Sequence, residues 1–140
     1  MKRGFTLLEL LVVIIIIGVL ATLGIQQYGR MIERARGAEA RMILGQIRST
    51  AAAYRLERGS CTGFDNTAAG IGTGADQIPS ACRATHYFSY TVSSTANGFT
   101  ATATRCTTGG KTPNGSSPLT LTLTTDFNAG TDTWGGTGGY

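Results

Sequence analysis

The chain has 140 residues, of which 41% are hydrophobic and 14% charged, and its formal net charge is +4. This length provides one small domain, and so modest a positive surplus does not favour nucleic acid as the main partner. No set of residues offers a paired acid and base or an activated nucleophile, so the sequence does not predict an enzyme.

A predominantly apolar run over residues 5–25 contains a single ionisable side chain, Glu9. A hydrocarbon core about 30 Å thick takes about 20 helical residues, so this run is long enough to span a bilayer. An ionisable residue inside such a segment predicts a function and a partner of opposite charge. If the chain is cut after Gly4, Phe5 carries a free α-ammonium, and the same amine on a neighbouring copy can pair with Glu9.

The leader-like residues 1–4 (MKRG), followed by 5–9 (FTLLE) and the apolar run, resemble the class III leader and N-terminal helix of type IV pilins and secretion pseudopilins. At motif level the resemblance covers the leader and the apolar run. It implies cleavage between Gly4 and Phe5 by a prepilin peptidase, N-methylation of Phe5, and retention of the apolar segment. It also implies assembly into a helical homopolymer with the help of a cytoplasmic ATPase and an inner-membrane platform protein.

The basic residues of the leader, Lys2 and Arg3, predict an N-in, C-out orientation. An ordinary secretory signal would instead lose its apolar region at a small-residue site downstream. We therefore expect a single-pass inner-membrane subunit before assembly and an extracellular pilus afterwards. The expected parts are a leader (1–4), a transmembrane or filament-core helix (5–25), an amphipathic helix continuing into the head (26–59), and a globular head (60–140).

The amphipathic helix shows one apolar face at helical spacing, made by Ala40, Ile43, Leu44, Ile47, Ala51 and Tyr54. Gly59 follows it as a stop signal.

Gln26 stands where the family usually has a proline. Gly18 and Gly24 are two points of low helix propensity at which the helix could unwind when subunits pack. The same glycines could instead serve only to let helices approach closely.

Residues 61–83 are predicted to form an irregular connection, and three segments after it are predicted to form strands. Residues 86–93 and 99–105 alternate around the turn signal Asn97-Gly98, and residues 119–125 place leucines on one face. A short fourth strand is expected around residues 131–134. The predicted fold class is α+β, a long N-terminal helix packed on a small antiparallel sheet of three to four strands, as in pilins.

Three cysteines, Cys61, Cys82 and Cys106, predict one disulfide and one free thiol in an exported domain. A Cys61–Cys82 bond would constrain the irregular connection and is the preferred pairing. The alternative is Cys82–Cys106, near the open end of the hairpin.

Asp126, Asn128 and Asp132 alternate with other residues around Gly130 and form a candidate Ca²⁺ site. Asx-turns explain the same Asp and Asn residues without a bound ion, so we predict no required cofactor and keep calcium as an alternative. The sequon at residues 114–116 indicates an exposed loop.

The basic residues of the head, Arg83, Arg105 and Lys111, suggest a solvated face more readily than a DNA-binding patch.

The first hypothesis for function is a type IV pilin that polymerises through its N-terminal helix. The alternative is the major pseudopilin of a type II secretion system, whose C-terminal signature is echoed only by residues 134–136 (WGG) and the aspartates. An alternative of another class is a membrane-anchored binding module, either a minor pilin adhesin or a DNA receptor. Twitching motility, attachment, DNA uptake and secretion are all compatible with such a fibre.

Overall fold

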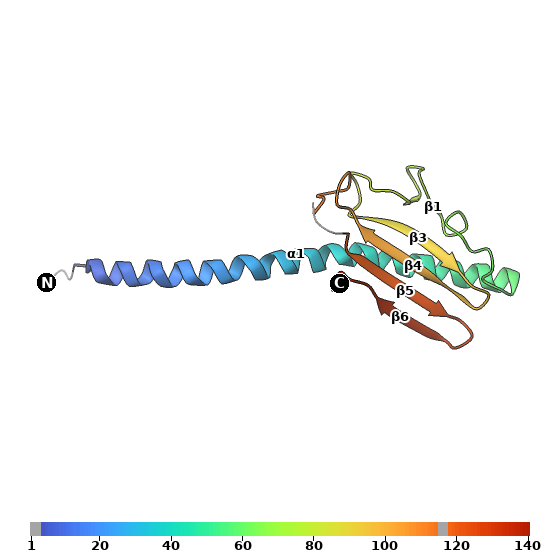
Figure 1. The fold of residues 1–140 in the computed structure, drawn as a ribbon, viewed down its shortest axis with the longest axis horizontal. Helices are drawn as coiled ribbons and strands as arrows, with labels where there is room; N and C mark the ends of the chain where they lie inside the picture. Colours follow the sequence, from blue (N-terminus) through green and yellow to red (C-terminus); the bar gives the residue numbers. More distant parts are fainter. Residues whose placement is uncertain (1–3, 115–117) are drawn as a thin grey trace. The chain divides into compact units, whose positions relative to one another are not determined.

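The computed structural model describes residues 4–114 and 118–140. Its elements are α1 (Leu7–Arg58), β1 (Ile71–Gly72), β2 (Ile78–Pro79), β3 (Phe88–Ser94), β4 (Gly98–Arg105), β5 (Thr120–Asp126) and β6 (Thr131–Gly135) (Figure 1). The predicted α+β class is confirmed, with β3-β4-β5-β6 forming a four-stranded sheet. Lys2 and Arg3 of the expected leader, and residues 115–116 of the sequon, lie outside the described residues.

The chain divides into two compact units, Met1–Ala35 and Arg36–Tyr140. In the first unit, every described side chain of α1 between Leu7 and Ile25 is exposed. Leu7 and Ile25 are 83% and 73% exposed. Among the described residues, α1 is the helix long and apolar enough to cross a membrane by length and composition. Within a single chain, the described part of this apolar segment therefore has no buried side chain.

The glycines of the apolar segment do not interrupt α1. The helix runs through Gly18 and Gly24, and a Cβ added at either position would meet nothing within 4 Å. Both interpretations of these glycines concern packed copies, so they stay predictions.

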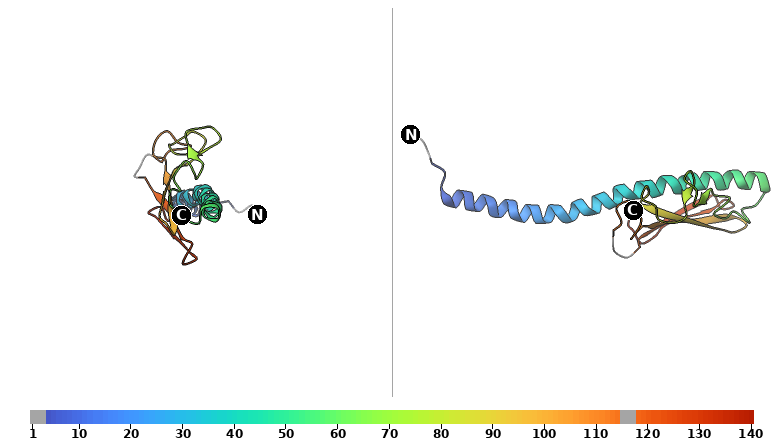
Figure 2. Two further views of the ribbon diagram at one scale, coloured as in Figure 1. Left: turned by 90° about the vertical axis from the view of Figure 1, so that its right-hand side faces the viewer. Right: turned by 90° about the horizontal axis from the view of Figure 1, so that it is seen from above.

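In the second unit, the predicted apolar face of α1 packs against one face of the sheet (Figure 2). Ala40, Leu44, Ile47 and Ala51 are completely buried. The helix ends at Arg58, and Gly59 follows with φ +74° while its N–H bonds to the Arg55 carbonyl at 2.7 Å. The left-handed conformation favours glycine, which confirms Gly59 as the stop.

Alternation along the strands sends apolar side chains to the helix-facing side of the sheet. The buried residues on this inner face are Phe88, Tyr90, Phe99, Ala101, Ala103, Leu121 and Leu123. The β3–β4 hairpin runs one residue past the predicted strands at the turn, and Gly98 there opens β4. A Cβ on Gly98 would lie 1.8 Å from the Thr125 carbonyl oxygen, so the close approach of β5 requires glycine.

The connection between α1 and β3 contains a short parallel pair, β1 and β2, which the sequence did not predict. Asn66 Oδ1 accepts a hydrogen bond from the Val92 N–H at 2.7 Å, and Phe64 is fully buried against Phe99. Arg83 donates to the carbonyls of Gly72 and Gly74 at 2.7 and 2.6 Å. Hydrogen bonds and one aromatic anchor therefore hold the connection in place.

Tyr140 packs its ring against α1 at Gly37 and edge-on to Phe88, with ring centroids 5.4 Å apart. A Cβ at Gly37 would lie 2.5 Å from Tyr140 Cδ1, whereas a Cβ at Gly45 of the same helix would meet nothing within 4 Å. The two glycines share one backbone conformation and differ in what faces them.

Gly45→Ala should raise the free energy of unfolding by up to about 1 kcal/mol, because alanine has the higher helix propensity. Gly37→Ala should displace the Tyr140 ring, so its free energy of unfolding should be about 1 to 3 kcal/mol lower than that of Gly45→Ala. Denaturant unfolding of the detergent-solubilised chain measures both. Equal effects of the two substitutions would show that the Tyr140 contact contributes nothing to stability.

Candidate functional site

Gly4 and Phe5 precede the first helical residue and are exposed, so the bond between them lies outside α1. The helix begins after Thr6, whose Oγ1 accepts a hydrogen bond from the Glu9 N–H at 3.3 Å. The Thr6 carbonyl accepts from the same N–H at 3.2 Å and from that of Leu10 at 3.3 Å. Thr6 is therefore the N-cap of α1, and Glu9 is the third residue of its first turn.

This pattern, Thr-x-x-Glu before an apolar run, is that of a capping box, which the sequence analysis missed. The signal was present in the letters of residues 6–9. A carboxylate in the first turn is also favoured by the helix dipole. The structure forms the Thr6 half of this motif, the bond from the Glu9 N–H to Thr6 Oγ1, and the Glu9 carboxylate adds a favourable charge near the start of α1.

The Glu9 carboxylate is exposed, and within the described part of a single chain it has no ion-pair partner. An amine supplied by another copy would therefore displace no existing ion pair. The pairing of Phe5 with Glu9 across copies stays a prediction, as do the cleavage and methylation of Phe5.

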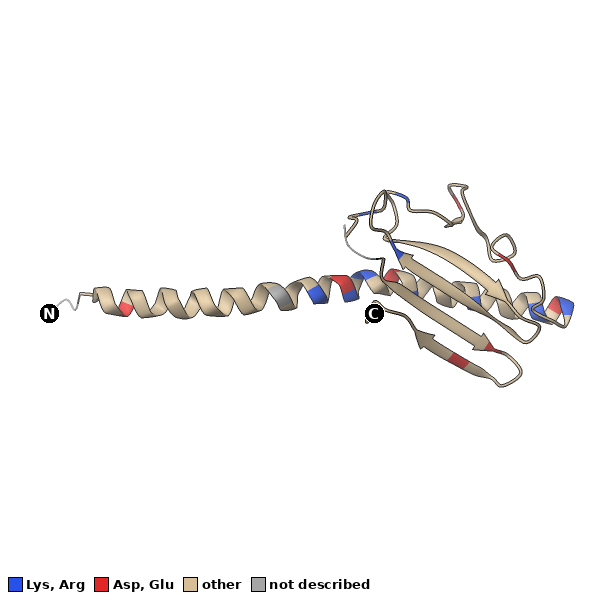
Figure 3. Cartoon of the chain, viewed as in Figure 1, with Lys and Arg blue, Asp and Glu red and all other residues tan. Residues whose placement is uncertain are grey.

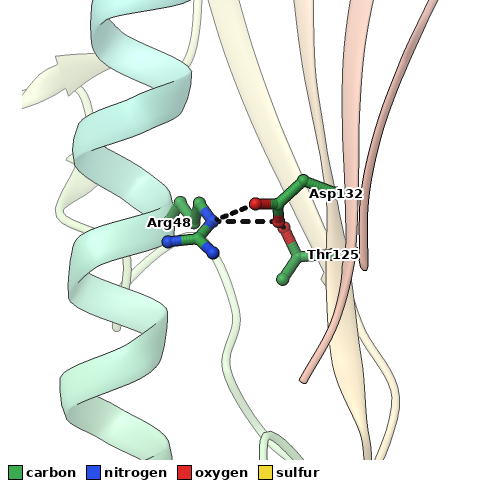
Figure 4. A network of polar contacts seen from close by, with 3 residues as sticks. All are labelled: Arg48, Thr125 and Asp132. Carbon is green, nitrogen blue, oxygen red and sulfur yellow. Dashed lines mark hydrogen bonds and ion pairs between the residues drawn. The ribbon is translucent and has the colours of Figure 1, made fainter. Parts of the chain in front are cut away.

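A second set of polar contacts joins α1 to the β5–β6 hairpin in the head. Arg48 Nε lies 2.8 Å from Asp132 Oδ2, and Thr125 Oγ1 donates to Asp132 Oδ1 at 2.7 Å (Figure 4). Arg48 and Thr125 are hydrogen-bond donors to the charged carboxylate, so they lower the pKa of Asp132. The Asp132 carboxylate in turn raises the pKa of Arg48, because it accepts a hydrogen bond from the charged guanidinium.

Two further arginines flank this pair at a spacing of seven residues along α1. Arg41 lies over the Trp134 ring at 5.3 Å and donates to the main-chain oxygen of Tyr140. Arg55 lies over the Phe127 ring at 5.3 Å and donates to Asn128 Oδ1. We call Arg41, Arg48 and Arg55 the arginine row. It lies beside the apolar stripe and fixes the hairpin to the helix.

The arginine row accounts for part of the candidate calcium site. Asn128 and Asp132 each contact an arginine, while Asp126 Oδ1 accepts hydrogen bonds from the N–H groups of Asn128 and Ala129 at 2.8 and 3.0 Å. The last two bonds form an Asx-turn. No cluster of three His, Cys, Asp or Glu side chains suited to a metal occurs in residues 4–114 and 118–140. Calcium binding gains no support from these contacts and stays a prediction.

The Arg48–Asp132 pair should make the free energy of unfolding depend on pH. Since the pKa of Asp132 is lowered on folding, the pair stabilises the fold above the ordinary carboxyl pKa, and this contribution is lost as pH falls through the folded-state pKa. Both side chains are partly exposed, so Asp132→Asn should cost about 1 kcal/mol or less at pH 7. Urea unfolding between neutral and acid pH should show this cost disappearing. In an Arg48→Gln background the pH-dependent difference should shrink, and an undiminished difference would contradict the assigned cause.

The disulfide joins Cys82 to Cys106, so the preferred Cys61–Cys82 pairing is wrong and the alternative is correct. Cys61 is a free, fully buried thiol, and burial raises its pKa. The physical reason is that the connection after α1 is already held by Asn66, Phe64 and Arg83. The bond instead ties the segment before β3 to the end of β4.

Cys82→Ala, Cys106→Ala and the double variant should each lower the free energy of unfolding by about 3 to 4 kcal/mol, because the bond closes a loop with a sequence separation of 24. Cys61→Ala should cost less, since it breaks no cross-link. Chemical unfolding with and without reductant measures the series, and peptide mapping after alkylation identifies the free thiol. A labelled Cys106 would refute this pairing.

Arg105 is not part of a solvated face, contrary to the sequence analysis. Its side chain is 1% exposed and donates to the carbonyls of Tyr87 and Thr112 at 3.0 and 2.6 Å. Lys111 and Arg105 both lie over the Tyr87 ring. The guanidinium therefore organises the loop that follows Cys106.

Comparison with known proteins agrees with the N-terminal motif. Residues 1–25 match the family model of the prokaryotic N-terminal methylation motif. Over 76 residues, 54% of this chain and 44% of the relative, the sequence is 36% identical to a fimbrial protein of Neisseria meningitidis serogroup B.

Two further relatives are of the same kind. The type IV major fimbrial protein FimA of Dichelobacter nodosus is 39% identical over 72 residues, 51% of this chain and 44% of the relative. The type IV major pilin protein PilE of Neisseria gonorrhoeae is 37% identical over 71 residues, 51% of this chain and 42% of the relative. The chain thus spans less than half the length of these relatives. No solved structure matches it significantly. The predicted resemblance to type IV pilins is confirmed.

Proposed function

We propose that this chain, which carries the N-terminal methylation motif and is similar to type IV pilins, is a structural subunit that polymerises through its N-terminal helix into a surface pilus. The observation that carries the proposal is the apolar segment of α1. Its side chains are exposed from Leu7 to Ile25, and its one carboxylate, Glu9, lies in the first turn.

So much apolar surface is stable only in lipid or against other apolar helices. Before assembly, the segment spans the inner membrane as a single-pass anchor. During assembly it leaves lipid and packs among the same segments of other copies, so that the apolar environment is exchanged and not lost. The subunit therefore moves from the membrane to an extracellular filament without exposing this helix to water.

The Phe5 ammonium sets the axial register in which these helices pack. Cleavage after Gly4 by a prepilin peptidase creates the amine, which then pairs with Glu9 of an adjacent copy. A charge in an apolar filament core is costly unless it is paired, so only registers that join the two charges are stable. Head-to-tail contact of this kind repeats without closing and builds an open helical polymer. A cytoplasmic ATPase and a platform protein are the partners proposed for this step.

The role is structural and not enzymatic in this proposal, and the relatives' names, fimbrial protein and major pilin, support it. The pseudopilin alternative rested on a weak echo of its C-terminal signature, in residues 134–136 (WGG) and the aspartates of the β5–β6 hairpin. Asp132 pairs with Arg48, which favours the pilin over the pseudopilin.

Replacing Gly4 by a bulky residue and replacing Glu9 by alanine should have separable effects. A bulky residue 4 does not fit the peptidase, so the precursor should stay unprocessed in the membrane. Glu9→Ala should be processed but should give few or no filaments, because the neighbouring ammonium is left unpaired. Immunoblots of membrane fractions and electron microscopy of sheared filaments measure the two steps.

Glu57→Ala, which removes an exposed carboxylate near the other end of α1, is the matched control and should assemble normally. Because Glu9 also lies in the capping box, Glu9→Gln separates its two roles. Glutamine keeps a capping side chain without the charge, so filaments from Glu9→Gln at wild-type levels would refute the charge pairing.

A further inference from the structure

The arginines of α1 fall into two groups that differ in their contacts. Those from residue 36 onward each contact an aromatic ring or a carboxylate of the same chain: Arg36, Arg41, Arg48, Arg55 and Arg58. Arg30 and Arg34 belong to the first compact unit and are exposed. Among residues 4–114 and 118–140, neither of them makes a hydrogen bond, an ion pair or a ring contact. The described part of the chain therefore gives these two arginines no role.

Arg30 and Arg34 come shortly after the apolar segment, five and nine residues beyond Ile25. Figure 3 shows this change as a long tan stretch of α1 beyond which blue and red return to the helix. At about 1.5 Å per residue, the two Cα atoms lie about 8 and 14 Å beyond that of Ile25 along the helix. The headgroup layer on each side of a bilayer is about 5 to 8 Å thick. Tyr28, 67% exposed, comes in between, and tyrosine is enriched at membrane–water interfaces.

The direction of helical side chains brings both guanidinium groups closer to this layer. Side chains of an α-helix lean toward its N-terminus, so each covers the turn before its own residue. One turn is about 5.4 Å, which returns the end of the Arg34 side chain to about the level of Arg30. Residues four apart lie on one face of a helix. Arg30 and Arg34 therefore present two guanidinium groups to the headgroup layer from the same face of α1.

Two costs argue against a merely solvated pair. Cations on the C-terminal side of the span oppose the N-in orientation that Lys2 and Arg3 favour. Like charges four residues apart on a helix also repel each other. A phosphate group between them would remove the repulsion and accept hydrogen bonds from both guanidinium groups. The headgroup must carry a net negative charge, because the ammonium of a zwitterionic headgroup already offsets its own phosphate.

We propose that Arg30 and Arg34 bind the phosphate of an anionic phospholipid, in the leaflet at the C-terminal end of the apolar segment. This contact sets the depth of the subunit in the membrane before assembly, and it breaks when the apolar segment leaves lipid. Charge complementarity and continuity with the apolar segment both select the lipid as the partner. The proposal rests on the proposed function, because it requires that segment to span a membrane first.

The test uses the full chain, solubilised from membranes in a nonionic detergent and mixed with equal amounts of phosphatidylglycerol, which is anionic, and phosphatidylcholine, which is zwitterionic. Native mass spectrometry counts each lipid bound to the chain. Wild type should retain phosphatidylglycerol at least about tenfold over phosphatidylcholine, because two arginines near an anionic headgroup add their attractions. Added salt should reduce this preference. Arg30→Gln combined with Arg34→Gln should remove it, while glutamine keeps the helix propensity.

Two matched variants separate a paired site from a general basic surface. Arg58→Gln combined with Lys111→Gln removes the same charge from exposed positions elsewhere and should keep the lipid preference. Arg34→Gln combined with Ala35→Arg keeps the total charge but takes the second arginine off the face of Arg30, so most of the preference should be lost. Full retention by this variant would overturn the two-arginine site.

Inorganic phosphate separates the lipid from a free ion. In lipid-free detergent it should bind equally weakly to wild type and to the variant that lacks both arginines. Binding of inorganic phosphate to wild type alone would assign the arginines to a free ion and overturn the lipid as their partner.

Failure of the inference and failure of the proposed function give different results. A wild-type chain that binds both lipids equally would overturn the inference and leave the pilus intact. Release of the chain from cell membranes by alkaline carbonate would overturn the membrane stage of the proposed function, and the inference with it.

Discussion

The packing of one apolar stripe of α1 against the inner face of the sheet is the interaction on which the head depends. Ala40, Leu44, Ile47 and Ala51 are fully buried there, and small alanines on both sides let the layers approach closely. This packing uses one side of the helix and one side of the sheet. It therefore leaves threonines of the outer sheet face, such as Thr91 and Thr124, in solvent, and it leaves residues 7–25 with no buried side chain in the described chain.

The arginine row extends this interface beyond the apolar stripe. Arg41, Arg48 and Arg55 are seven residues apart, close to two helical turns, so they point along a common line. Each meets the β5–β6 hairpin differently, through an indole ring, a carboxylate or an amide. A planar guanidinium group suits all three kinds of partner, whereas the ammonium group of a lysine would not. The edge strand of the sheet is thus held by polar and cation–π contacts where apolar side chains run out.

The sequence predicted the long helix, its buried stripe, its stop at Gly59 and the hairpin at Asn97-Gly98, because each has a local periodic or turn signal. It did not predict which cysteines pair, since that depends on Asn66 and Phe64 already fixing the connection. The oxygen-bearing residues of the β5–β6 turn suggested an ion because their arginine partners lie far away in sequence. The burial of Arg105 was missed because its acceptors are main-chain carbonyls, which no side-chain pattern reveals.

On the proposed function, a small domain that also serves as a polymer unit has to separate its sources of stability from its surface of assembly. The head closes its own fold with the apolar stripe, the arginine row and the Cys82–Cys106 bond, and none of these uses the apolar segment of α1. Assembly through the helix, driven by apolar burial, would then be independent of the contacts that stabilise the head.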